Sequence, residues 1–287
     1  TKQIPLPHTQ EGDFCNEPNI ERVDFMDVTY VNPGFQAMID SIMLFQTDEE
    51  TAYWSDSLFY FFPTIKKESF GALDFRGKKE FLSCELKKIY CEQEELLNQK
   101  AALYNSHWSK CRPQIEEALS EAFDLDVHPL FNDLRAEICL NPICPRFLRE
   151  RYFQIFYLNS ERGAVGLSIH EVIHFLWFYV WNQEFQDSYD EYERPSLKWI
   201  LSEMVVESIM RDDRLSSINP YFPRENGGCV YGYFQDMRLN QKMALDVIDE
   251  YYKCSNIREF MHKSYAYCRE NEAEIRAHIK KSEEAFG

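Results

Sequence analysis

The sequence contains little glycine and proline, with 10 and 12 residues of each among 287. Collagen-like and disordered classes are therefore excluded, because 45 % of the residues are hydrophobic and no repeat is present. A chain of this length buries about three quarters of the surface that its unfolded form exposes. With 22 Phe and 17 Tyr, the composition predicts a thick helical protein with a substantial core.

Positive charge is also scarce, with 31 Lys and Arg against 48 Asp and Glu and a formal net charge of −17. Nucleic-acid binding depends largely on basic side chains that neutralise phosphates. The short Lys pairs, such as Lys78-Lys79 and Lys280-Lys281, lie among Glu residues and indicate solvated helix faces. We therefore expect no nucleic-acid partner.

The nine cysteines lack the paired short spacings of a zinc ribbon or knuckle, and their number is odd. No uninterrupted apolar run reaches the roughly 18 residues of a membrane span, and the first residues, TKQIPLPHTQEGD, contain no apolar signal-peptide segment. These absences predict reduced thiols, a cytoplasmic location and no membrane span.

Hydrophobic periodicity predicts an α+β protein that is predominantly helical. Residues 1–33 lack such periodicity and are expected to form an extended arm or tail. Two helices are expected within 35–62, separated by a cap signal at Thr47-Asp48, then a long helix to about Trp108 and another that opens at Pro113. Later helices are expected at about 195–210, 236–253, 257–267 and 270–286.

Two β-type runs, 134–140 and 152–158, flank a proline-containing loop and predict a small antiparallel sheet. The composition changes near residue 130, which divides the chain into a helical N-terminal part, 1–130, and a second part, 131–287. The run 162–181 has the residue preferences of a strand, but its length favours a buried helix.

That helix contains the HExxH segment HEVIH at 170–174. A helix places His170 and His174 on one face with Glu171 beside them, which is the arrangement of a zinc hydrolase. The surrounding residues are apolar, and polar groups buried there without partners would cost several kcal/mol. Metal ligation satisfies them; the alternative is a pair of core histidines bonded to backbone or carboxylate groups.

A zinc site of this kind needs a third protein ligand, with the fourth position left for water. Glu203 and Glu207 share one face of an otherwise apolar helix, 29 and 33 residues after His174, and supply the candidates. The alternative is that this helix face is exposed to solvent and that Glu207 forms an ion pair with Arg211, four residues later.

HEVIH followed by a helix with Glu-x-x-x-Glu resembles the gluzincin branch of zinc metallopeptidases. The resemblance covers about residues 150–235 and implies a zincin-like core, with Zn²⁺ held by the two histidines and Glu203. It implies that Glu207 forms a hydrogen bond to His170, which agrees with the need to fix the tautomer of the ligand ring. The metzincin extension is absent, since Trp177 stands where its glycine should be.

In the mechanism that the resemblance implies, zinc lowers the pKa of its water and Glu171 accepts the proton as that water attacks a peptide carbonyl. Gluzincins often draw an oxyanion donor from a downstream Tyr or His. Tyr231 and Tyr233 in the segment GGCVYGY are the best candidates, with ordinary packing as the alternative role, and His262 is a further one.

The expected partner is a peptide or protein substrate, and the pattern indicates no particular oligomeric state. If the strand at 152–158 lies at the sheet edge, peptide would bind by strand addition, although this strand could equally be internal.

Two other functions stay open. Glu171-x-x-His174 and Glu259-x-x-His262 are the paired motifs of a di-iron carboxylate protein, although His170 would then be superfluous. The second open function is that of a binding module with a zincin-like fold and no peptidase activity.

Overall fold

The computed structural model describes residues 25–46, 52–219 and 229–286. Helices dominate this part of the chain, as predicted. They are α1 Phe35–Leu44, α2 Ala52–Phe61, α3 Lys67–Gly71, α4 Phe75–Phe123, α5 Glu161–Phe185, α6 Leu197–Met210, α7 Asp213–Ile218, α8 Gly232–Gln235, α9 Ala244–Lys253, α10 Ile257–Glu270 and α11 Glu272–Phe286, with a short 3-10 helix, η2, at Tyr189–Tyr192. The expected cap at Thr47-Asp48 and most of the expected N-terminal arm lie outside the described residues.

The main sheet is mixed, and the prediction of an antiparallel sheet is wrong. Its strands are β1 Val28–Val31, β2 Leu134–Cys139, β3 Arg146–Phe147 and β4 Tyr152–Phe156, in the order β1-β2-β4-β3. The two predicted strands exist as β2 and β4 but run parallel, because the loop between them contains the two-residue strand β3, which pairs antiparallel with β4. Both strands are buried almost throughout, as parallel strands covered on two faces usually are.

Strand β4 is therefore internal to the sheet, and β3 lies at its edge. The opposite edge is β1, which comes from the segment expected to be an arm and pairs with β2 from Val28 to Val31. A separate hairpin, β5 Arg238–Leu239 and β6 Lys242–Met243, occupies the start of the helix expected at 236–253, so that helix begins at Ala244.

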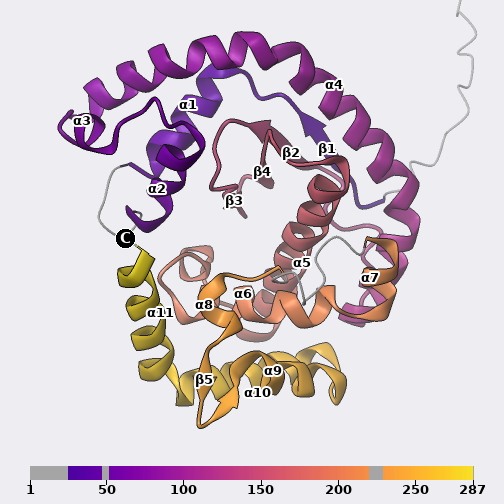
Figure 1. Ribbon diagram of the computed structural model, residues 1–287. Helices are drawn as coiled ribbons and strands as arrows, with labels where there is room; N and C mark the ends of the chain where they lie inside the picture. The colour runs from indigo at the N-terminus through magenta and orange to yellow at the C-terminus, as the bar shows by residue number, and fades with distance from the viewer. Residues whose placement is uncertain (1–24, 47–51, 220–228, 287) are drawn as a thin grey trace, which may run out of the picture.

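Helix α4 is continuous through Pro113, although a helix break was predicted there. It runs along the outside of the molecule and arches around the sheet (Figure 1). Trp108 and Ile115, one on each side of the proline, are fully buried, and the helix packs against β1, α1 and α5. These contacts on both sides hold a helix that local sequence preference alone would end.

Helix α5 runs through the centre of the fold (Figure 1). Ser160 caps its first turn by accepting a hydrogen bond from the N–H of Gly163, and almost every residue from Gly163 to Trp181 is buried. In length and composition α5 matches a membrane-spanning helix, which the sequence analysis did not expect, and 89 % of its most apolar window is buried inside the protein.

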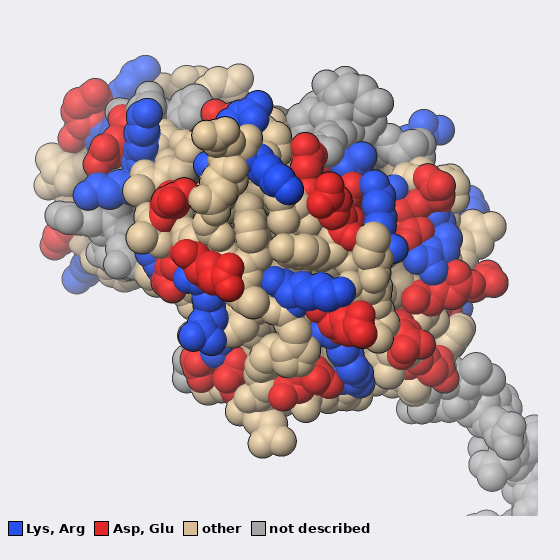
Figure 2. Space-filling model, turned by 90° about the horizontal axis from the view of Figure 1, so that it is seen from below, with Lys and Arg blue, Asp and Glu red and all other residues tan. Residues whose placement is uncertain are grey.

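The predicted boundary near residue 130 separates segments that share a sheet and a core. Strand β1 precedes the boundary and pairs with β2 beyond it. Almost all of the buried hydrophobic residues that the structure describes form one cluster that extends from Met26 to Ile279. On the face seen in Figure 2, Lys and Arg side chains alternate with Asp and Glu, and no continuous basic patch is visible among the described residues.

Candidate metal centre

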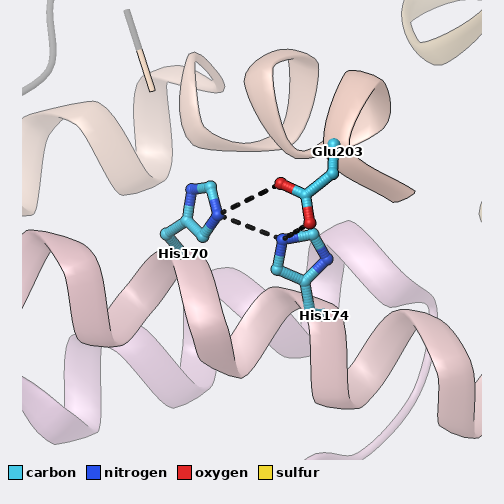
Figure 3. A group of neighbouring side chains, drawn as sticks. All are labelled: His170, His174 and Glu203. Carbon is cyan, nitrogen blue, oxygen red and sulfur yellow. Dashed lines mark hydrogen bonds and ion pairs between the residues drawn. The ribbon is translucent and has the colours of Figure 1, made fainter. Parts of the chain in front are cut away.

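The centre lies where α5 faces α6. His170 and His174 extend from α5, one helical turn apart, and Glu203 extends from α6 toward both rings (Figure 3). The two Nε2 atoms are 3.0 Å apart. Glu203 places Oε1 3.6 Å from Nε2 of His174 and Oε2 4.0 Å from Nε2 of His170. All three residues are buried.

The donor set fits a single divalent metal ion. One nitrogen or oxygen from each of His170, His174 and Glu203 lies within 4.8 Å of the other two, and no other group of this kind occurs among the described residues. Two imidazole nitrogens on one tetrahedral zinc ion stand about 3.3 Å apart. The observed 3.0 Å between the Nε2 atoms is close to that separation.

Both imidazoles are held neutral, which is the form that binds metal. Burial lowers the pKa of His170 to about 3, and the positive charge of Arg146 contributes to this shift. The pKa of His174 is lowered well below its usual value by burial, by Arg146 and by His170. The Nδ1 atom of His174 is buried without a hydrogen-bond partner in the described part of the chain.

Glu171 lies beside the three ligand candidates and is suited to accept a proton. Burial raises its pKa to about 7; Arg146 opposes this rise and Glu203 adds to it. A carboxyl group with a pKa near 7 can both take and return a proton at neutral pH. The role of Glu171 as general base stays a prediction.

Arg146 also lies at the centre, although nothing in the sequence singled it out. Its guanidinium is buried and touches both carboxylates, with Nη1 3.2 Å from Oε2 of Glu171 and Nη2 3.3 Å from Oε1 of Glu203. The residue is on β3, inside what the sequence indicates as a loop. No local pattern separates it from nearby Arg149 and Arg151; only the return of β3 along β4 brings it to α5.

The centre opens into a cavity of about 320 Å³. Its wall carries three carboxylates, two guanidinium groups and two thiols among apolar side chains. The lining residues are Phe45, Ile143, Cys144, Pro145, Arg146, Leu167, His170, Glu171, Glu193, Arg194, Trp199, Glu203, Cys229, Val230 and Tyr231.

Of the two tyrosines predicted as oxyanion donors, Tyr231 lines this cavity. Burial and the nearby Glu203 raise its pKa well above the usual value, so its hydroxyl keeps its proton. Tyr233 lies behind it, stacked on the Tyr231 ring with centroids 5.3 Å apart, and is absent from the described cavity wall.

Glu207 is buried on α6, one turn beyond Glu203. It accepts hydrogen bonds from the backbone N–H of Cys229 at 3.2 Å and from the Cys229 thiol at 3.4 Å. These bonds tie α6 to the segment that leads to Tyr231. The bond from Glu207 to His170 that the resemblance implies stays a prediction.

The second Glu-x-x-His motif lies outside the centre. Glu259 and His262 are exposed on α10, where Glu259 pairs with Lys263 and His262 pairs with Glu184 at the end of α5. The structure does not bring the two motifs together, so the arrangement of a di-iron site is not found among the described residues. His262 does not line the described cavity, so the structure does not place it as an oxyanion donor.

No family model matches this chain, and comparison with curated proteins and with solved structures finds no match.

Proposed function

We propose that this chain is a zinc-dependent metallopeptidase. The observation that carries the proposal is the buried convergence of His170, His174 and Glu203, two of which, His170 and Glu203, line a cavity together with Glu171. Two imidazoles and one carboxylate are the protein ligands of catalytic zinc sites that keep one position open.

Zinc is the metal that this donor set favours, because neutral imidazole with a single carboxylate suits a borderline-soft ion better than calcium or magnesium. His170, His174 and Glu203 would hold it, and when bound it polarises a carbonyl and makes water a stronger nucleophile near pH 7. The remaining chemistry belongs to the side chains around the ligands.

Glu171 would act as general base and then as general acid. As a water oxygen bonds to the substrate carbonyl carbon, the water proton passes to Oε2 of Glu171 and the carbonyl π pair moves onto the carbonyl oxygen. The same proton then passes to the amide nitrogen as the C–N bond breaks and the electron pair on the oxygen forms the carbonyl again, which gives an amine and a carboxylic acid. The raised pKa of Glu171 supports both transfers at neutral pH.

An extended peptide would pair with β3, not with β4, because β3 already covers the edge of β4 next to the centre. Strand addition there would run the peptide past Arg146 and into the cavity.

Two substitutions test the proposal. Glu203→Ala should lose stoichiometric zinc, and Glu171→Gln should keep zinc while hydrolysis of an unstructured protein or peptide mixture falls at least about 100-fold. Zinc is measured by elemental analysis and cleavage by mass spectrometry. Glu259→Gln is the matched control, since this carboxylate is exposed and paired with Lys263.

Zinc binding without cleavage by the unaltered protein would indicate a binding module. Full zinc content in Glu203→Ala, with loss in Glu207→Ala, would show that the two glutamates have exchanged roles. Iron in place of zinc would contradict the assignment of the centre.

A further inference from the structure

The structure gives the candidate centre a buried cation of its own. The Arg146 side chain is 9 % exposed, and its Nη1 and Nη2 atoms lie 3.2–3.4 Å from the carboxylates of Glu171 and Glu203. Strand β3 fixes this position, since Arg146 pairs with Phe153 of β4 and Phe147 with Tyr152. A buried guanidinium has five N–H donors and needs acceptors for them.

The charges around Arg146 change when a divalent ion enters. Ionised Glu171 and Glu203 with Arg146 and two neutral histidines have a net charge of −1, which favours a cation. Glu193 and Arg194, which also line the cavity, have opposite charges and leave this sum unchanged. With a divalent ion the net charge becomes +1. A buried site with excess positive charge favours an anion as its next ligand.

Proton transfer then removes a partner of Arg146. When Glu171 takes the water proton it becomes neutral, and the negative charge appears instead on the substrate carbonyl oxygen. Arg146 already contacts Glu171 and therefore lies beside the place where this charge moves. A fixed cation at that position stabilises the charged intermediate more than the neutral substrate.

We propose that Arg146 is the anion-binding residue of this centre and holds the substrate oxygen that becomes negatively charged during hydrolysis. The proposal rests on the proposed peptidase function. The substrate oxygen receives the electron pair of its own carbonyl bond, so the step needs no further reactant.

Arg146 is better placed for this role than the other donors in the cavity. Tyr231 offers one neutral hydroxyl, whereas Arg146 offers several donors and a full charge. Arg194 also lines the cavity, but its guanidinium pairs with Glu283 and lies 6.0 Å from the ring centroid of Trp199.

Phosphate binding to the zinc-loaded protein tests the anion site without relying on catalysis. Inorganic phosphate is a small tetrahedral anion, and its affinity is measured by isothermal titration calorimetry. The measurements use Glu171→Gln as the parent, because this variant removes one of the two carboxylates that contact Arg146 and would compete with phosphate, and leaves the candidate ligand Glu203 in place. Zinc content is determined for every variant first.

Adding Arg146→Met to this parent should weaken phosphate binding about 10- to 100-fold, the usual effect of losing charge-assisted hydrogen bonds. Arg146→Lys keeps the charge and should lose only part of the affinity, and it replaces Arg146→Met if that variant holds no zinc. Arg194→Met removes a charge from the same cavity and should change the affinity less than about threefold.

Equal phosphate affinity in the parent and in both Arg146 variants, at equal zinc content, would overturn the proposal. So would an equal loss in Arg194→Met, since any positive charge in the cavity would then suffice.

A kinetic measurement separates this proposal from the peptidase proposal. With Glu171 present, Arg146→Met should lower kcat about 100- to 1,000-fold with little change in KM. Peptide cleavage with an unchanged kcat in Arg146→Met would reject the proposed role of Arg146 and leave the peptidase proposal intact. Weakened phosphate binding in a protein that cleaves no peptide would reject the peptidase and, with it, the assigned substrate oxygen.

Discussion

At the scale of single residues, the centre combines two neutral imidazoles with two carboxyl groups whose pKa values are higher than usual. Burial lowers the pKa values of His170 and His174, so neither imidazole has a proton for a metal ion to displace near neutral pH. Burial also raises the pKa values of Glu171, to about 7, and of Glu203. Protons therefore compete with metal at the carboxyl groups.

Metal affinity should depend on pH through Glu171. A divalent ion lowers the pKa of this neighbouring carboxyl, so binding releases a proton when the pH is below about 7, the pKa in the metal-free protein. Zinc affinity should therefore rise as the pH increases from 5.5 to about 7 and change less above that. Competitive titration with a chelator at several pH values measures this trend.

Glu171→Gln provides the control for this pH dependence. The neutral amide cannot ionise, so the rise in affinity up to pH 7 should become smaller. A rise centred near pH 6.5 that is as large in Glu171→Gln as in the unaltered protein would mean that a histidine proton is displaced instead, contrary to the burial argument.

At the scale of elements, the chain shows where local sequence is sufficient and where it is not. The HEVIH helix and the Glu203 helix could be predicted, because the length of an apolar run and the spacing of a motif such as HExxH are local properties. Strand direction in β2 and β4 could not, since it depends on β3, which has only two residues. The position of Arg146 was hidden for the same reason.

Capping of α5 should contribute measurably to stability. Ser160→Ala removes the acceptor for the N–H of Gly163 at the start of the helix that carries the centre. The free energy of unfolding should fall by about 1 kcal/mol. Urea denaturation measures this, with Ser160→Asn as a control that keeps the cap; equal losses in the two variants would show that the cap is not the cause.

Pro113 should weaken α4. It is exposed in the helix interior and cannot donate to the carbonyl of Ser109, the residue four positions earlier. Pro113→Ala should therefore raise the free energy of unfolding by about 1–3 kcal/mol. Alanine also makes the unfolded chain more flexible than proline does, which offsets a small part of this stabilisation.

Urea denaturation also tests this expectation. Gln114→Ala, at the exposed neighbouring position, should change the stability by less than about 0.5 kcal/mol. A destabilised Pro113→Ala protein would show instead that the proline is needed to shape the helix.

At the scale of the whole molecule, the centre joins elements that are distant in the sequence. Strand β3, α5 and α6 each contribute one or more charged or metal-ligating side chains, and α5 and α6 also pack against helices that follow and precede them. A bound ion would link these elements directly. Its free energy of binding then adds to the free energy of folding.

Removing metal should lower the melting temperature. At free zinc about 1,000 times its dissociation constant, binding adds about 4 kcal/mol to stability, which corresponds to roughly 8 °C or more for a chain of this size. Differential scanning calorimetry before and after chelation measures the change. Glu203→Ala is the control and should melt at the same temperature with and without zinc.

Strand β3 also suggests how this centre could be redesigned. Two backbone pairs and the stacked rings of Phe147 and Tyr152, 4.4 Å apart, set its register. A slip of one residue would turn Arg146 to the opposite face of the sheet. Substitution of Phe147 could therefore move Arg146 away from Glu171 and Glu203, although Phe147 itself has no charge and is not a candidate metal ligand.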